Sequence, residues 1–223
     1  MREERKKQKA RHYWERNAKR YDAALRITVP ALPRVLEELN FQGDESVLEV
    51  AAGTGLVTQA LAQRVREVVA VDYAFAMVEK LKARIQQAGL QNVQCLQADI
   101  YALPFEPASF DAVVACNVLH LLPDLPKAYA AMLRVLKPGG RLIVPTVCQS
   151  ETWTARIAAK LLSATGLPIQ RRFSAASLRA SLEKAGLRVQ KEKLFPSLMP
   201  LAYVEGRRDE TSSPQSPSPG LRS

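Results

Sequence analysis

The sequence has few of the residues that form disulfide frameworks and metal sites. Its 223 residues include three cysteines, Cys95, Cys116 and Cys148, and two histidines, His12 and His120. The cysteines are odd in number, widely spaced and never arranged as Cys-x-x-Cys. A disulfide-stapled fold and a structural zinc site are both disfavoured, so we expect no metal.

Long apolar runs are also lacking. The runs at 113–116 and 119–122 are typical, and a membrane-spanning helix needs roughly 20 apolar residues. The opening residues, MREERKKQKAR, are charged and have neither the apolar stretch of a secretory signal nor the serine-rich, acid-poor composition of a transit peptide. We therefore expect a cytoplasmic protein.

Positive charge is concentrated at the start of the chain. The formal net charge is +10, and residues 1–20 hold nine Lys or Arg and three Glu, which is six of those ten charges. Such a segment can contact phosphates, anionic lipid or an acidic substrate, although a solvated helix face is the commoner outcome. With 6% aromatic residues and no added RNA-binding module, nucleic acid is an improbable partner.

Strand-like and helix-like segments alternate through the middle of the sequence. This order requires crossover connections, and it predicts an α/β, Rossmann-like, doubly wound, mainly parallel sheet with helices on both faces. A turn at Pro138-Gly139-Gly140 is expected to end the third of these helices. The expected strands are 47–52, 68–72, 93–99, 110–116 and 141–147, and the expected helices between them are 56–66, 74–88 and 125–137.

The two ends of the chain complete this organisation. An apolar stripe from Ala10 to Leu25 predicts one basic amphipathic helix near the start. Later segments predict helices at 151–165 and 175–185, the second capped by Ser174, and strands at 187–195 and 200–205. We expect one domain over 1–208, with 1–30 as a lid and 148–173 as a cap or substrate segment. The Ser/Pro-rich residues 209–223 are expected to be disordered.

The stretch VLEVAAGTGLVTQALA, residues 47–62, carries the strongest chemical signal. A strand delivers Glu49, and a turn containing Gly53 and Gly55 leads into a helix. Glycine lets a ligand lie against such a turn and tolerates backbone angles that other residues avoid. A dinucleotide fingerprint would need a third glycine where Thr58 stands, and Glu49 would repel a pyrophosphate but suits a cationic ligand.

Two further acids follow the next strands. Asp72 ends the second strand seventeen residues beyond Gly55, where a carboxylate can accept hydrogen bonds from both hydroxyls of a ribose. Asp99 follows the third strand, where it can accept from an adenine amino group. Glu49, Asp72 and Asp99 with one glycine-rich turn form a constellation that favours an adenosine-containing ligand.

Five motifs together resemble the class I S-adenosylmethionine-dependent methyltransferases. They are E-x-A-x-G-x-G from Glu49, the acid Asp72, A-D-x-x-x-L-P-F at 98–105, S-F-D-x-V at 109–113 and L-K-P-G-G-R-L at 136–142. Within that class the sequence is similar to the ubiquinone/menaquinone C-methyltransferases and bacterial phosphatidylethanolamine N-methyltransferases, over about residues 13–205. The resemblance implies S-adenosylmethionine as cofactor and a seven-stranded sheet whose last strand is antiparallel.

The resemblance also implies roles for individual residues. The 53–55 turn would meet the amino-acid end of the cofactor, Asp72 the ribose, and Asp99 the adenine. The family usually has Gly or Cys where Ala51 and Ala52 stand, and we expect alanine to retain binding. The implied cofactor-binding set is Glu49, Ala51, Gly53, Gly55, Asp72, Tyr73, Met77, Asp99, Ile100 and Asn117.

Candidates for catalysis and for covering the site are fewer. His120 and Tyr21 are the two possible catalytic groups, although a lone histidine in an apolar stretch is more often structural. The motif Y-W-x-x-N-A-x-x-Y-D at 13–22 resembles the family's opening helix, which would place Tyr13 or Tyr21 over the site as a lid. Trp153 is a candidate for the substrate cover, although such a helix is more often domain surface.

The methyl acceptor stays open at this point. A small soluble nucleophile is the preferred acceptor, whether its methylated atom is N, O, S or C. A membrane-associated acceptor, a phospholipid amine or quinone precursor, is the alternative, with the basic first helix and residues 151–172 contacting anionic lipid peripherally. An RNA methyltransferase, an NAD-dependent oxidoreductase and a non-catalytic cofactor-binding regulator fit less well, and the oligomeric state stays undetermined.

Overall fold

A computed structural model describes residues 2–164 and 166–210 of the chain. Its centre is a seven-stranded sheet of order β3-β2-β1-β4-β5-β7-β6. β7 pairs antiparallel with both β5 and β6, and the other pairs of the described sheet are parallel, so the predicted mainly parallel sheet with an antiparallel last strand is confirmed. The strands are β1 Ser46–Val50, β2 Glu67–Asp72, β3 Val93–Gln97, β4 Phe110–Val114, β5 Leu136–Val147, β6 Leu187–Phe195 and β7 Leu201–Arg208.

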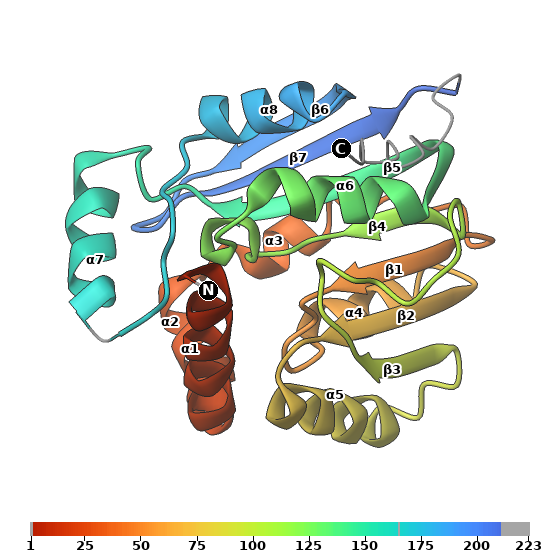
Figure 1. Cartoon of the computed structure of the whole chain (residues 1–223), viewed down its shortest axis with the longest axis horizontal. Coiled ribbons are helices and arrows are strands. Elements are labelled where there is room, and N and C mark those ends of the chain that lie inside the picture. The colour runs from red at the N-terminus through yellow and green to blue at the C-terminus, as the bar shows by residue number, and fades with distance from the viewer. Residues whose placement is uncertain (1, 165, 211–223) are drawn as a thin grey trace, which may run out of the picture.

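Helices cover both faces of the sheet (Figure 1). One hydrophobic cluster packs α6 and α8 against one face, and a second packs α3, α4 and α5 against the other. Every residue of β1 is buried, as expected for a central parallel strand covered on both faces. The helices are α1 Arg2–Asn17, α2 Tyr21–Thr28, α3 Leu32–Leu36, α4 Leu56–Ala62, α5 Phe75–Gln87, α6 Leu125–Val135, α7 Trp153–Ala164 and α8 Ala175–Lys184, with 3₁₀ turns η1 Ala18–Arg20 and η2 Leu119–Leu121.

Three details differ from the sequence-based expectations. The single N-terminal helix is interrupted by η1, and the short helix α3 was not predicted. The expected tight turn at Pro138-Gly139-Gly140 is wrong, because α6 ends at Val135 and β5 already begins at Leu136. A Cβ on Gly140 would lie 2.8 Å from Leu136 Cδ1, so this glycine allows close packing inside the strand. The predicted tail falls largely outside the described residues.

Helix α8 begins where the sequence predicted. The hydroxyl of Ser174 accepts a hydrogen bond from the backbone N–H of Ser177, and the hydroxyl of Ser177 accepts one from the N–H of Ser174. This reciprocal pair satisfies two backbone donors that a helix start leaves without partners. Local sequence therefore fixes the start of the helix.

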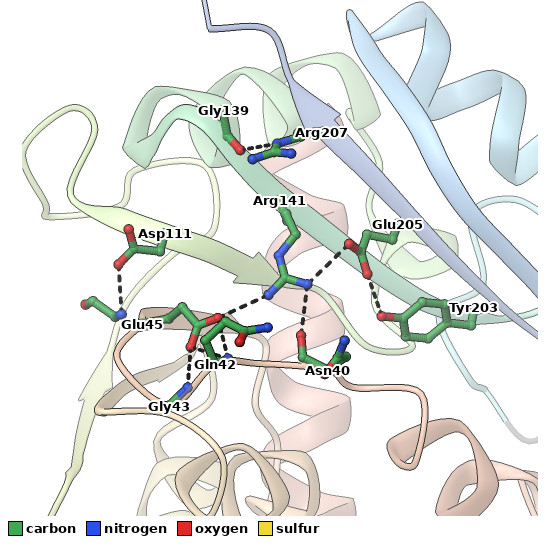
Figure 2. Close-up of polar contacts among 11 residues, drawn as sticks. Asn40, Gln42, Gly43, Glu45, Asp111, Gly139, Arg141, Tyr203, Glu205 and Arg207 are labelled. Atoms are coloured by element: carbon green, nitrogen blue, oxygen red, sulfur yellow. Dashed lines mark hydrogen bonds and ion pairs between the residues drawn. The ribbon is translucent and has the colours of Figure 1, made fainter.

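Arg141 of β5 joins the elements at the end of the sheet where β1 begins (Figure 2). Its guanidinium forms ion pairs with Glu205 of β7 at 3.3 Å and with Glu45 at 3.5 Å, and it donates to the Asn40 carbonyl at 2.9 Å. Glu205 is buried and also accepts from the Tyr203 hydroxyl at 2.8 Å. The segment before β1 is thereby tied to the far half of the sheet.

We expect Arg141→Ala to lower the free energy of unfolding by about 2–3 kcal/mol, because it leaves the carboxylate of Glu205 buried without its cation. Urea unfolding followed by circular dichroism measures the effect. Arg207→Ala is the matched control: that exposed arginine donates to the Gly139 carbonyl at 2.7 Å, so its loss should change stability by about 0.5 kcal/mol or less. Equal effects of the two variants would contradict this reading of Figure 2.

Candidate functional site

A cavity of about 280 Å³ lies at the carboxyl ends of the parallel strands. Residues that follow β1, β2 and β3 line one part of it, and residues that follow β4 and β5 line another. Helices α1 and α2 line it from the N-terminal side, and residues 162, 167 and 169 add a wall next to α7. Figure 1 shows α1, α2 and α7 together at this end of the sheet. The carboxyl edge is where open α/β sheets bind their ligands.

The turn after β1 is held by the acid that ends β2. Asp72 Oδ2 accepts a hydrogen bond from the Gly53 N–H at 2.8 Å, and its Oδ1 accepts from the Ala74 N–H at 2.9 Å. Asp72 lines the cavity and is 9% exposed. Burial raises the pKa of its carboxyl, and the backbone hydrogen bonds oppose that rise. A carboxylate has about four acceptor positions, so lone pairs remain for a ligand.

The two glycines of the turn serve different purposes. Gly53 has φ +58° and lines the cavity, and a Cβ there would lie 3.4 Å from Tyr21 Cε1. Gly55 has φ +86° and does not line the cavity; a Cβ there would lie 2.6 Å from Leu81 Cδ1 of α5. Gly55 is thus required for its backbone angle and for helix packing, which corrects the expectation that it clears room for a ligand. Ala51 lines the cavity at φ +53°, a conformation that is costly for a residue with a Cβ.

Glu49 lies behind the turn rather than in the cavity. It is 2% exposed, adjoins a separate hollow of about 20 Å³, and accepts a hydrogen bond from the Thr58 hydroxyl at 2.5 Å. Burial raises the pKa of its carboxyl to about 8. The side chain is therefore mostly protonated at neutral pH, so the expected anionic partner for a cationic ligand is corrected to a neutral hydrogen-bonded acid. Thr58 stands where a dinucleotide fold has glycine, and its hydroxyl donates a hydrogen bond to this carboxyl.

The N-terminal helices are fastened over the cavity by two acids. Glu15 of α1 accepts hydrogen bonds from the first N–H groups of α5, at Phe75 (2.7 Å) and Ala76 (2.9 Å). Asp22 of α2 forms an ion pair with Arg84 of α5 and accepts from the Thr54 hydroxyl. The segment predicted as a lid is thus attached to the glycine turn and to α5. Neither acid was predicted as functional, although Asp22 closes the Y-W-x-x-N-A-x-x-Y-D motif.

An aromatic row underlies this lid. The rings of Tyr13 and Trp14 meet edge to face with centroids 4.9 Å apart, and those of Trp14 and Tyr21 do so at 5.7 Å. All three side chains line the cavity. Burial is the main cause that raises the pKa of the Tyr21 hydroxyl, and the nearby thiol of Cys116 and carboxylate of Asp72 add to it. Tyr21 therefore keeps its proton at neutral pH and does not act as a base.

The part of the cavity beyond β4 and β5 holds buried polar atoms that the protein leaves without partners. Among the described residues, Asn117 Nδ2, His120 Nδ1 and Gln149 Oε1 have no hydrogen-bond partner, and all three side chains line the cavity. Asn117 also has φ +52°, and its Oδ1 accepts from the Val147 N–H at 2.9 Å. Burial lowers the pKa of His120 to about 4, so the imidazole is neutral at pH 7. Gln149 was not predicted, because no local motif marks it.

Most of the predicted site residues share this cavity, but three do not. Glu49 and Gly55 lie behind it, as described above. Trp153 is 73% exposed on α7 and does not line the cavity, as in the alternative that this helix is domain surface. The predicted residues that line the cavity are Tyr13, Tyr21, Ala51, Gly53, Asp72, Tyr73, Met77, Asp99, Ile100, Asn117 and His120.

The cofactor end of the cavity fits S-adenosylmethionine. A Cβ at Gly53 would fill the space beside Tyr21, Asp72 offers carboxylate lone pairs, and Asn117 Nδ2 is a buried donor without an acceptor among the described residues. Met77 and Ile100 supply buried apolar surface for a flat ring. Within residues 2–164 and 166–210, no three His, Cys, Asp or Glu side chains gather closely enough to hold a metal ion.

Part of the chain is similar to known proteins. Residues 48–144 match the family model described as a methyltransferase domain. A demethylmenaquinone methyltransferase of Clavibacter sepedonicus is 41% identical over 108 residues, which cover 48% of this chain and 42% of that protein. A malonyl-[acyl-carrier protein] O-methyltransferase of Halorhodospira halophila is 34% identical over 140 residues, which cover 61% of this chain and 47% of that protein. The chain spans about half the length of these curated relatives.

The fold is also found among solved structures. An S-adenosylmethionine-dependent methyltransferase from Aquifex aeolicus superposes with a TM-score of 0.68 at 22% identity, over 86% of this chain and 97% of that one. At this identity the likeness shows the fold alone.

Glu49→Gln should change how stability depends on pH. The carboxyl keeps its proton up to about pH 8 when folded, but it ionises near its ordinary pKa of about 4.3 when unfolded. The unfolded state then binds fewer protons in this interval, so this group makes stability fall as pH rises from about 4.3 to 8. Relative to wild type, we expect the variant to gain about 2–4 kcal/mol between pH 5 and pH 8, since each pKa unit corresponds to about 1.36 kcal/mol.

Urea unfolding at several pH values measures this difference. The contributions of all other titrating groups to the pH dependence cancel, because both proteins contain those groups. Glu79→Gln is the control, since Glu79 is an exposed partner of Lys82. That variant should run parallel to wild type. A Glu49→Gln curve that also runs parallel would show that the buried carboxyl is ionised.

Proposed function

We propose that the chain, in which residues 48–144 match a methyltransferase domain, transfers a methyl group from S-adenosylmethionine to a small molecule bound in the same cavity. One observation carries the proposal: the cavity joins a cofactor end around Gly53 and Asp72 to a second end around His120 and Gln149. The two parts lie under one lid, so a donor and an acceptor can meet out of contact with water.

In this proposal each part of the cofactor contacts different residues of the cavity. The Asp72 carboxylate accepts from ribose hydroxyls, the Gly53 turn leaves space for the amino-acid end, and Met77 with Ile100 lies against the adenine. Bound S-adenosylmethionine supplies an electrophilic methyl group on a sulfonium. The protein has no need to provide a nucleophile; it holds two reactants in place, and such positioning is worth roughly 7–11 kcal/mol.

The lid residues exclude water and hold the N-terminal segment in place. Glu15 and Asp22 fix α1 and α2 to α5, and Tyr21 then lies against Gly53. We assign Tyr21 to closing the site, because its raised pKa keeps the hydroxyl protonated. His120 is neutral and is the one candidate of the two that can accept a proton from an acceptor, as a weak base.

Asp72→Asn should lower the affinity for S-adenosylmethionine about 10- to 100-fold, because hydrogen bonds to a charged group are worth about 1.5–3 kcal/mol. Calorimetry with S-adenosylmethionine, S-adenosylhomocysteine and NAD measures binding, and a deuterated-methyl screen over amines, thiols, phenols and lipid extracts reveals the acceptor. Asp111→Asn is the control: that acid is bonded to Ser46 and Lys137 at the other end of the strands and should leave affinity unchanged. Binding of NAD but not of S-adenosylmethionine would refute the proposal.

A membrane-associated acceptor is the second candidate, and α7 is the observation that favours it. Trp153, Ile157 and Leu161 are spaced four residues apart and are 73%, 53% and 68% exposed. Arg156 and Lys160 are exposed beside them. An apolar stripe flanked by cations suits an anionic bilayer surface, and α7 adjoins the cavity through Leu162. In the part of the chain that the structure describes, no helix is long and apolar enough to cross a bilayer.

Replacing Trp153, Ile157 and Leu161 together by serine should reduce partitioning onto vesicles containing phosphatidylglycerol at least tenfold, because the apolar stripe would no longer enter the interface. Flotation at low and high salt measures this, and binding by the unaltered chain should weaken with salt. Leu194→Ser, which changes an apolar residue 39% exposed on β6, is the control and should float as the unaltered chain does. No salt-sensitive lipid binding by the unaltered chain would end this second candidate.

A further inference from the structure

Two buried side chains at the acceptor end of the cavity lack the hydrogen bonds that burial normally requires. Gln149 is 2% exposed and His120 is 7% exposed. In the described part of the chain, Gln149 Oε1 and His120 Nδ1 have no partner, and both side chains line the cavity. A buried polar atom without a partner costs about 1–3 kcal/mol. A ligand that supplied the missing hydrogen bonds would recover that free energy.

The backbone holds both residues firmly at neighbouring strand ends. His120 lies in η2 after β4, and its carbonyl accepts from the Gln170 N–H at 2.9 Å. Gln149 follows β5, the parallel neighbour of β4, and the next residue, Ser150, donates its N–H to the Phe173 carbonyl at 2.9 Å. Backbone groups here are satisfied while the side-chain atoms are not. The arrangement is that of a preformed binding site rather than a loose loop.

The surroundings of this pair are uncharged. The charged residues that line the cavity, within the part of the chain described, are Arg11, Arg20, Asp72 and Asp99. They come from α1, from η1 and from the ends of β2 and β3, and none follows β4 or β5. Burial is the cause found for the lowered pKa of His120, with no charged neighbour contributing.

Arg171 is a cation in the segment whose backbone bonds to the His120 carbonyl, but its side chain does not line the cavity. Its Nη2 donates to the carbonyls of Leu122 at 2.8 Å and Pro123 at 3.1 Å, and its buried Nε has no partner among the described residues. An anionic or cationic acceptor would therefore lose its hydration here without gaining an opposite charge. An uncharged acceptor meets no such cost.

We propose that Gln149 and His120 bind a hydroxyl group of an uncharged, largely apolar methyl acceptor. This inference rests on the proposed function and narrows its acceptor to one chemical class. A hydroxyl both donates and accepts, so it can donate to Gln149 Oε1 and accept from an N–H of the amide or the imidazole. The apolar remainder of the acceptor then lies against apolar side chains such as Leu162, Ile169 and Met199, which also line the cavity.

Binding of a matched series of probes tests the proposal without relying on turnover. The probes are 4-propylphenol, its analogue with methyl in place of hydroxyl, 4-propylbenzoate and 4-propylbenzylamine, titrated calorimetrically into the whole chain saturated with S-adenosylhomocysteine. We expect the phenol to bind about tenfold more tightly than the methyl analogue, since about 1.4 kcal/mol corresponds to a factor of ten. Tighter binding of the benzoate or the benzylamine than of the phenol would overturn the proposal.

Gln149→Leu should weaken binding of 4-propylphenol about tenfold and leave the methyl analogue within twofold. Thr146→Val is the matched control, because its buried Oγ1 also has no partner among the described residues but the side chain does not line the cavity. That variant should bind both probes as the unaltered chain does. Equal weakening of both probes by Gln149→Leu would show a merely structural role and would overturn the proposal.

Retained affinity of Gln149→Leu for S-adenosylhomocysteine shows that the variant is folded. If the unaltered chain binds the cofactor but does not prefer the phenol, the acceptor class is wrong and the proposed function stands. If it fails to bind S-adenosylmethionine and S-adenosylhomocysteine at all, the proposed function fails. In that case the same phenol series, run without cofactor, decides on the hydroxyl site separately.

Discussion

The carboxylate of Asp72 is the point on which the site depends. Its two oxygens accept hydrogen bonds from Gly53 and Ala74, and so they join the turn after β1 to the turn that begins α5. Both turns would otherwise expose backbone donors at the mouth of the cavity. The same carboxylate is buried, which raises its pKa, so additional hydroxyl donors from a ribose would favour its charged form. In the proposed function, one carboxylate therefore both holds the two turns and binds the ribose.

The lid follows from the same arrangement. Because α5 starts directly beyond Asp72, its first N–H groups face the N-terminal segment and donate to the carboxylate of Glu15, which caps the helix. Asp22 then reaches Arg84 further along α5, together with Thr54 of the glycine turn. The cofactor end, the lid and α5 thus form one connected unit. The cavity-lining residues that follow β4 and β5 come from different strands, and none of them carries a formal charge at neutral pH.

How much the sequence could predict differs between these two ends. Alternating strands and helices, a glycine turn and an acid after each early strand are local patterns, and they predicted the sheet and the residues Gly53, Asp72 and Asp99, which line the cavity. Gln149 was missed because its importance comes from burial without a partner, which no local pattern reveals. Glu49 was misread for the same reason: its position was clear, but the hydrogen bond from Thr58 and the burial that keeps it protonated are tertiary. Trp153 lies on the predicted helix, but its side chain is exposed and does not line the cavity, which only the packing of α7 could reveal.

A crystal structure with S-adenosylhomocysteine tests the central claim most directly. The account predicts that both ribose hydroxyls lie within hydrogen-bonding distance of the Asp72 carboxylate, with the amino-acid end against Gly53 and the lid still fastened through Asp22 and Arg84. A ligand bound elsewhere, or one in this cavity whose ribose does not contact Asp72, would contradict it.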